Sequence, residues 1–136
     1  MNCIFCKIIA GEIPSHNVYE DGDTFAFLDI SPASRGHTLV IPKQHAADLF
    51  SMPIHTLEAV GRTTQQVARW LQQAVQCDGL NIVQSNGAAA GQTVFHYHVH
   101  VIPRWQGDHA LHLWQPSATD HAALGALATE LRNAGV

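Results

Sequence analysis

Three histidines, His96, His98 and His100, alternate with apolar or aromatic residues. Strict alternation is the period of a half-buried strand, so the imidazoles are expected on one face and residues such as Tyr97 and Val99 on the other. Side chains on one face lie about 6.5–7 Å apart, because each residue advances a strand by roughly 3.3 Å. Imidazoles transfer protons near neutral pH, act as nucleophiles and bind metals. A polar strand face or a chelating surface patch is the structural alternative, but the regular row favours a functional site.

Two cysteines near the N-terminus, Cys3 and Cys6, have CxxC spacing. Three cysteines in the whole chain do not suggest a disulfide framework, and in a reducing compartment a CxxC pair is typical of a metal or redox site. The chain has no second CxxC, so any further zinc ligands must be distant histidines. Two unpaired thiols are the alternative. Cys77, near the end of a predicted helix, is interpreted as structural.

The length of 136 residues, 46% of them hydrophobic, fits one domain over residues 1–136 with a real core. The formal net charge is −4 and no basic run occurs, so nucleic-acid binding is not predicted. No segment approaches the roughly 18–20 apolar residues of a membrane span. The N-terminus lacks the charged region and apolar run of a signal peptide. We therefore expect a cytoplasmic protein without a membrane segment.

The hydrophobic pattern predicts several strands around two longer helices. Strands are expected over residues 16–20, 24–29, 37–41, 80–85 and 96–102. Helices are expected over residues 3–10, 45–50 and 53–77, and again after a cap at Thr119 or Asp120. Because these elements do not follow a βαβ order, we expect an α+β fold in which helices cover an antiparallel sheet.

The histidine row, preceded by Gly91-Gln92-Thr93-Val94, resembles the signature of the histidine triad (HIT) family of nucleotide hydrolases and transferases. Residues 5–14, 26–32 and 36–45 resemble other blocks of the family, so the resemblance covers about residues 3–104. It implies a HIT-like fold with a five-stranded antiparallel sheet, one long helix and shorter helices. It also implies a homodimer formed through the long helix and a sheet edge.

The resemblance assigns a role to each histidine of the triad. His98 matches the nucleophile that attacks the α-phosphorus, while a backbone carbonyl fixes its other ring nitrogen. His100 matches the position that contacts the phosphate and leaving group, and His96 completes the catalytic triad. The implied substrate is a purine nucleotide derivative.

Further residues match the nucleotide-binding positions of the family. A phosphate cradle is expected from Asn86, Gly91, Gln92 and Thr93. Asp29 matches the carboxylate that holds the ribose hydroxyls. Phe5, Ile8, Phe27 and Ile30 match the walls of the base pocket. From the residues alone, Asn86 and Asp29 would be turn residues and the four apolar side chains would be plain core.

Some bacterial HIT proteins with this cysteine pair bind zinc through two histidines as well, which correspond to His45 and His96. The resemblance thus implies a closed, structural Zn²⁺ site of Cys3, Cys6, His45 and His96. A metalloenzyme with zinc on all three triad histidines is the alternative. The remaining histidines, His37 among them, are interpreted as surface or packing residues.

The favoured function is hydrolysis at the α-phosphate of a nucleoside phosphoramidate, as in the Hint-like branch, through a nucleotidyl-histidine intermediate. The first alternative is a dinucleoside polyphosphate hydrolase. The second is a nucleotide-binding regulatory protein whose hydrolysis is incidental.

Overall fold

The computed structural model describes residues 2–135. Its elements in chain order are α1 (Ile4–Ile9), β1 (Asn17–Glu20), β2 (Thr24–Leu28), β3 (Thr38–Pro42), η1 (Leu49–Ser51), α2 (Ile54–Val75), β4 (Gly79–Val83), η2 (Ala88–Ala90), β5 (Val99–Arg104) and α3 (His121–Ala134). All strand pairs are antiparallel, in the order β1-β2-β3-β5-β4. The predicted α+β fold with a five-stranded antiparallel sheet is therefore confirmed.

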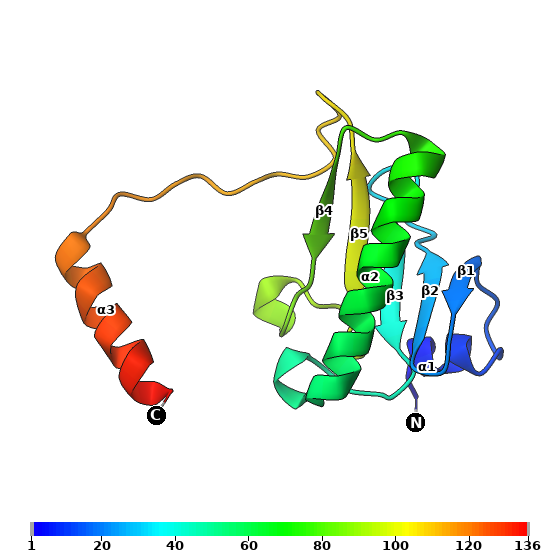
Figure 1. Cartoon of the computed structure of the whole chain (residues 1–136), viewed down its shortest axis with the longest axis horizontal. Helices are drawn as coiled ribbons and strands as arrows, with labels where there is room; N and C mark the ends of the chain where they lie inside the picture. The colour runs from blue at the N-terminus through cyan, green and yellow to red at the C-terminus, as the bar shows by residue number, and fades with distance from the viewer. Residues whose placement is uncertain (1, 136) are drawn as a thin grey trace.

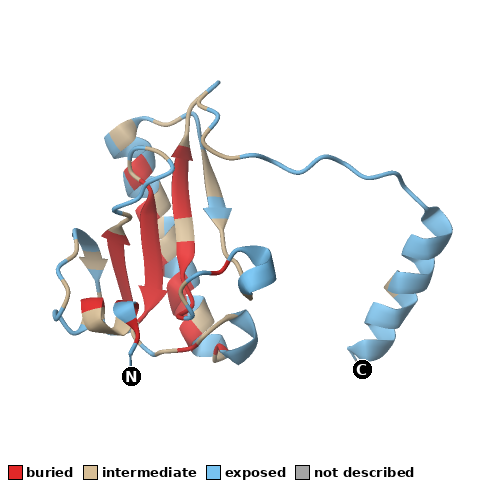
Figure 2. Cartoon of the chain, turned by 180° about the vertical axis from the view of Figure 1, so that it is seen from behind, coloured by how far each residue is buried: buried red, intermediate tan, exposed pale blue. Residues whose placement is uncertain are grey.

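The long helix α2 covers one face of the sheet (Figure 1). Its buried residues, such as Val60 and Val67, pack against Val40 and Val101 of the central strands. The strand residues that alternate with these, such as Phe27 and Leu39, point to the other face of the sheet. There they form a second apolar cluster with residues of α1, including Phe5. Figure 2 shows that the buried residues concentrate in β2, β3 and β5. The sheet thus has a helix-covered face and an α1 face, and the histidine row belongs to the latter.

The regular part of the histidine strand is shorter than predicted. β5 begins at Val99 rather than at His96, because the backbone N–H of Tyr97 donates to Ala46 O at 2.7 Å and not to a sheet neighbour. The alternation itself holds: Tyr97 and Val99 are in the α2 core, and His98 is on the opposite side, against Phe5. The predicted separation of the two faces is correct.

Two predicted helices differ in their bounds. The segment 45–50 is not an α-helix, and only Leu49–Ser51 forms a 3₁₀ turn, closed by a reciprocal capping box between Asp48 and Ser51. The long helix ends at Val75 because Gln76 adopts a left-handed conformation (φ 51°). The final helix is capped as expected, since Asp120 accepts from Ala123 N at 3.1 Å.

The last helix, α3, stands apart from the rest of the structure (Figures 1 and 2). The preceding segment leaves the far end of β5, and residues 112–120 are exposed throughout. None of the residues of α3 is buried. Among residues 2–135, no helix is long and apolar enough to cross a membrane.

Candidate active site and metal centre

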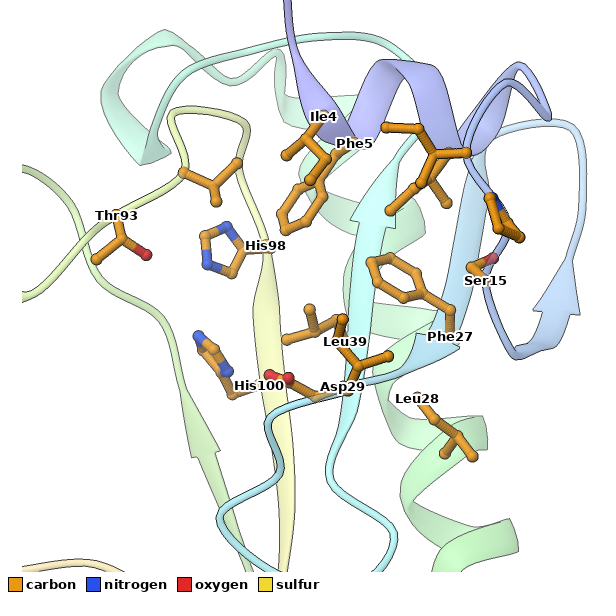
Figure 3. A pocket seen from close by; sticks show the side chains of 15 residues that line it. Ile4, Phe5, Ser15, Phe27, Leu28, Asp29, Leu39, Thr93, His98 and His100 are labelled. Carbon is orange, nitrogen blue, oxygen red and sulfur yellow. The ribbon is translucent and has the colours of Figure 1, made fainter.

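A cavity of about 250 Å³ opens on the α1 face of the sheet (Figure 3). One part is apolar, and there Phe5 meets Phe27 edge to face with ring centroids 5.6 Å apart. The other part holds the side chains of Asp29, His98 and His100. Eight of the residues expected to contact a nucleotide line this cavity: Phe5, Ile8, Phe27, Asp29, Ile30, Thr93, His98 and His100. An apolar slot beside a carboxylate and two imidazoles matches the three parts of a nucleotide.

The ring of His98 is held in one orientation by the backbone. Its Nδ1 lies 2.7 Å from the carbonyl oxygen of His96, and since a carbonyl only accepts, Nδ1 carries the proton. In the neutral ring, the other nitrogen, Nε2, is then the one with the lone pair. The side chain is 8% exposed, lines the cavity, and packs against Phe5 with ring centroids 5.1 Å apart. In its neutral form, His98 thus offers the lone pair of Nε2 from a largely buried ring, as a nucleophile requires.

His37 fixes the tautomer of His100. The N–H of Ala33 donates to His37 Nδ1 at 2.9 Å, so His37 carries its proton on Nε2. That Nε2 lies 2.9 Å from His100 Nδ1, which must then accept. His100 is left with an N–H at Nε2, available to donate in the cavity that its side chain lines. His37 is buried, as a packing residue would be, and it also contacts His100, a relationship that the sequence did not suggest.

Asp29 is the third member of this group. Its Oδ2 lies 3.5 Å from His37 Nε2, and its Oδ1 accepts from Ser31 N at 2.8 Å. Burial lowers the pKa of His100 to about 4, and the neighbouring His98 and His37 act in the same direction. Burial also lowers the pKa of His37, which Asp29 partly offsets. Both imidazoles are therefore neutral at pH 7, as the tautomer assignment requires.

The side chain of Gln92 is buried in the loop before the histidine row. Its side chain is 4% exposed, and both amide hydrogens are used, by Ala47 O at 2.6 Å and Val94 O at 3.1 Å. Its Oε1 accepts from Gly87 N at 2.7 Å. Because both amide hydrogens are used within the protein, the Gln92 side chain braces the loop that leads into the histidine row, and the place of Gln92 in the phosphate cradle stays a prediction.

Asn86 and Gly91 also serve the loop rather than the cavity wall. Asn86 Oδ1 accepts from Leu49 N at 2.7 Å, and its amide exchanges hydrogen bonds with Gln84. Gly91 has φ 93°, a left-handed conformation suited to glycine, and its N–H donates to Ala88 O at 3.0 Å. Of the four residues expected to form the phosphate cradle, Thr93 is the one that lines the cavity.

The predicted metal ligands converge on one point. Distances of 3.5 Å and 3.6 Å separate His96 Nδ1 from the sulfurs of Cys3 and Cys6. His45 Nδ1 lies 3.4 Å from Cys6 Sγ and 3.1 Å from His96 Nδ1. Residues from α1, from the segment after β3 and from the histidine row thus come together as the spacing and the resemblance predicted.

These separations fit a tetrahedral zinc site. Zn–S bonds of about 2.3 Å and Zn–N bonds of about 2.0–2.1 Å place neighbouring S and N ligands about 3.6 Å apart and two nitrogens about 3.4 Å apart. The backbone supports this set, because His96 Nε2 donates to Pro42 O at 2.8 Å and leaves Nδ1 as the lone-pair nitrogen. Burial lowers the pKa of His96 to about 4, so the ring is neutral. Two cysteine sulfurs, which bind zinc as thiolates, and two neutral imidazoles are a donor set that structural zinc takes.

Comparison with known proteins agrees with the site. A family model described as the HIT domain matches residues 10–107. The chain belongs to the HIT family. The Hit protein of Bacillus subtilis strain 168 is 46% identical over 121 residues, which make up 88% of this chain and 83% of that protein. Membership supports a coarse function, that of a nucleotide-binding hydrolase.

Solved HIT structures superimpose closely. A protein from Streptococcus mutans UA159 has a TM-score of 0.96 and 46% identity, and the match covers 100% of this chain and 87% of that one. A histidine triad nucleotide-binding protein from Candida albicans has a TM-score of 0.89 and 38% identity, covering 97% and 96%. A zinc-bound histidine triad family protein from Mycobacterium smegmatis has a TM-score of 0.78 and 40% identity, covering 96% and 98%.

Proposed function

We propose that this protein hydrolyses nucleoside phosphoramidates of purines, with His98 as the nucleophile. The observation that carries the proposal is the hydrogen bond from His98 Nδ1–H to His96 O, which makes Nε2 the lone-pair nitrogen of the neutral ring in a side chain that lines the cavity. A fixed tautomer spares the reaction the cost of orienting the ring. The membership in a family of nucleotide-binding hydrolases supports the same reading.

The lining of the cavity suggests how the substrate lies. The base enters the apolar part between Phe5, Ile8, Phe27 and Ile30. Asp29 then accepts from the two ribose hydroxyls, since a carboxylate offers two acceptor oxygens. The α-phosphate reaches the polar part beside His98 and His100, where Thr93 is a further donor. This order places the three parts of the nucleotide along one cavity.

The reaction proceeds in two displacements. His98 Nε2 forms a bond to the α-phosphorus as the P–N bond of the substrate breaks, and the departing amine takes up one proton from solvent, which the attacking water of the second step returns. Water then attacks the phosphorus of the nucleotidyl-histidine, which releases the nucleoside monophosphate and restores His98. The Nε2–H of His100 donates a hydrogen bond to the phosphoryl oxygens in both steps, where it stabilises the developing charge.

A panel of substrates tests this proposal. Adenosine and guanosine phosphoramidates are compared with diadenosine polyphosphates, with His98→Ala as the blank and His55→Ala, an exposed histidine of α2, as the matched control. We expect phosphoramidates to have the highest kcat/KM and His98→Ala to abolish turnover. A nucleotidyl adduct on the peptide that contains His98, detected by mass spectrometry after acid-free quenching, identifies the intermediate.

The alternatives give different results in the same panel. A higher kcat/KM for diadenosine polyphosphates would identify the protein as a dinucleoside polyphosphate hydrolase. Tight binding of nucleoside monophosphates without turnover of any substrate assigns a nucleotide-binding regulatory protein. The absence of an adduct on His98 in an active preparation would overturn the assignment of the nucleophile.

We also propose that Cys3, Cys6, His45 and His96 hold a structural Zn²⁺. The donor types, their separations of 3.1–3.6 Å and the Mycobacterium smegmatis neighbour support this. Zinc bound there would join α1 to the histidine row and supply no open coordination position for chemistry. Metal analysis of a Cys3→Ser, Cys6→Ser double variant tests the ligand set. Zinc retained at full occupancy would favour the alternative site on the three triad histidines.

A further inference from the structure

The apolar part of the active-site cavity contains a polar side chain that the proposed function does not use, that of Ser15. Five of the residues that line the cavity have hydrogen-bonding side chains: Ser15, Asp29, Thr93, His98 and His100. Figure 3 shows Ser15 and His98 at opposite ends of the cavity, with Phe27 between them. Ser15 therefore lies away from the histidines that are proposed to contact the phosphate.

The backbone on both sides of Ser15 is bonded to the elements that form the apolar slot. Before it, the N–H of Glu12 donates to Lys7 O, in α1, at 2.9 Å. After it, the N–H of Leu28, in β2, donates to His16 O at 3.0 Å. The side chain of Ser15 is half-buried. Because α1 and β2 also carry the aromatic walls of the slot, the Ser15 hydroxyl has a fixed place relative to a base bound there.

The apolar walls of the slot discriminate poorly among bases of similar size. A hydrophobic pocket does not strongly reject a group of the same shape and different polarity, whereas a hydrogen-bonding group disfavours an analogue that lacks its partner. Among residues 2–135, Ser15 is the one hydrogen-bonding side chain at the end of the cavity away from His98. Any discrimination among bases by a side chain at that end therefore depends on Ser15.

The orientation proposed above directs the outer edge of a purine towards Ser15. The ribose is attached to the five-membered ring of the purine, and its hydroxyls are proposed to contact Asp29. The six-membered ring is then the part of the nucleotide furthest from the phosphate and from His98. Its outer edge carries the substituent at position 6, which is an amino group in adenine and a carbonyl oxygen in guanine and hypoxanthine.

We propose that the Ser15 hydroxyl recognises the polar substituent at position 6 of the purine. This inference rests on the proposed function, whose orientation of the nucleotide it uses. A hydroxyl both donates and accepts hydrogen bonds, and its hydrogen rotates to suit the partner. Ser15 Oγ thus accepts from the amino group of adenine or donates to the carbonyl oxygen of guanine and hypoxanthine. The ligands that it selects are 6-amino and 6-oxo purine nucleotides, and it disfavours a purine with only hydrogen at position 6.

Titration calorimetry on the full chain tests this recognition with three nucleotides that differ at position 6. These are the 5′-monophosphates of adenosine, inosine and purine riboside, the last of which has hydrogen there. Because a neutral hydrogen bond makes a modest net contribution, we expect the wild-type protein to bind the first two about 3–10-fold more tightly than the third.

Ser15→Ala removes the hydroxyl with little change of shape. We expect this variant to bind adenosine and inosine monophosphates about 3–10-fold more weakly than the wild-type protein and to bind purine riboside monophosphate as before. The comparison of each ratio between the two proteins cancels differences in stacking among the bases, as in a double-mutant cycle. An equal loss of affinity for all three nucleotides, or no change for any, would overturn the proposal.

Thr93→Ala is the matched control, because it removes a hydroxyl from the other end of the same cavity. It should weaken the binding of all three monophosphates alike, so the ratios among them should stay at their wild-type values. A loss of base preference in Thr93→Ala as large as that in Ser15→Ala would show that the preference does not come from a contact with Ser15.

Binding and turnover are measured separately, so this proposal and the proposed function can fail independently. The monophosphates bind without any reaction at His98. A base preference that Ser15→Ala removes, in a protein that hydrolyses no phosphoramidate, would support the role of Ser15 and contradict the proposed function. Hydrolysis of adenosine and purine riboside phosphoramidates with equal kcat/KM would support the proposed function and contradict the role of Ser15. The absence of binding for all three monophosphates would overturn both.

Discussion

The backbone of His96 holds His98, while the side chain of His96 lies among Cys3, Cys6 and His45. The carbonyl oxygen of His96 accepts from His98 Nδ1–H at 2.7 Å, and its ring nitrogen Nδ1 lies 3.5 Å from Cys3 Sγ. A single residue therefore connects the proposed zinc site to the proposed nucleophile. Any loosening of its ring also moves the carbonyl that fixes the tautomer of His98.

Zinc removal should for this reason affect both stability and turnover. We expect Cys6→Ser to lower the free energy of unfolding by about 3 kcal/mol and Tm by roughly 10 °C, because a structural metal contributes directly to folding. We also expect kcat to fall more than KM rises, since His98 loses its orientation. Cys77→Ser, a cysteine outside the metal cluster, should change neither quantity. Unchanged Tm and kcat after complete zinc removal would contradict the coupling.

Loss of the donor at position 37 should impair turnover with little effect on binding. His37→Leu removes the Nε2–H that points at His100 Nδ1, so His100 can take the wrong tautomer. We expect kcat to fall by about 10–100-fold, the range seen for residues that orient a functional imidazole. His37→Gln keeps an N–H donor and should recover part of kcat. If His37→Gln is no better than His37→Leu at equal Tm, the tautomer role is wrong.

Acid should destabilise the fold through His100. Its pKa is about 4 in the folded protein, and about 6.5 in the unfolded chain. Between these values the unfolded state binds a proton that the folded state does not, so stability falls as the pH drops from 6.5 towards 4. We would measure the free energy of unfolding with urea at several pH values in this range. For His100→Gln, this free energy should change less with pH than it does for the wild-type protein. His55→Gln, at an exposed position of α2, should keep the wild-type slope.

The ribose contact of Asp29 can be isolated with substrates that lack hydroxyls. We expect Asp29→Asn to lower kcat/KM for ribose substrates by about 10–100-fold, because a hydrogen bond to a charged group contributes about 1.5–3 kcal/mol. With 2′,3′-dideoxy substrates the same variant should lose much less. Equal losses with both substrates would show that Asp29 acts through His37, which lies 3.5 Å away, and not through the ribose.

Variants of the adjacent residues Gln92 and Thr93 should distinguish a residue that supports the loop from one that contacts the substrate. Gln92→Ala leaves the carbonyls of Ala47 and Val94 without their donor, so we expect it to cost about 1–3 kcal/mol of unfolding free energy. Thr93→Ala, at an exposed position in the cavity wall, should raise KM at nearly constant Tm. A normal Tm for Gln92→Ala together with a raised KM would favour Gln92 as a phosphate ligand over a supporting role in the loop.

Alternation alone was enough to predict the two faces of the histidine row. Tyr97 and Val99 do pack under α2, and His98 does lie on the other side. The start of β5 could not be predicted, because Tyr97 N bonds to Ala46 O in a loop more than fifty residues earlier in the sequence. A bond of that kind leaves no local pattern in the residues around it.

The contacts of His37 and Gln92 could not be predicted, for the same reason. His37 has the parity of Leu39, which pairs with His100 in the sheet, so its side chain faces the site. Which face of the sheet this side chain occupies can be related to His100 only when the pairing of β3 with β5 is known. Gln92 is adjacent to Thr93 in a loop that resembles a phosphate cradle, and its partner Ala47 lies 45 positions away. The cytoplasmic location, the single domain and the purine preference stay predictions.

The last strand of the sheet to be synthesised is also a central one. β5 lies between β3 and β4, so until residues 99–104 have left the ribosome the sheet consists of β1-β2-β3 and a separate β4. Cys3 and His96 are likewise 93 residues apart in the sequence, so Cys3 is synthesised long before its partner. Both proposed sites therefore assemble in one late step, when β5 inserts between its neighbours and His96 reaches the thiols. A nascent or truncated chain that stops before His96 lacks one of the four proposed zinc ligands and the proposed nucleophile, and we expect it to be inert towards nucleotides until the histidine row has been made.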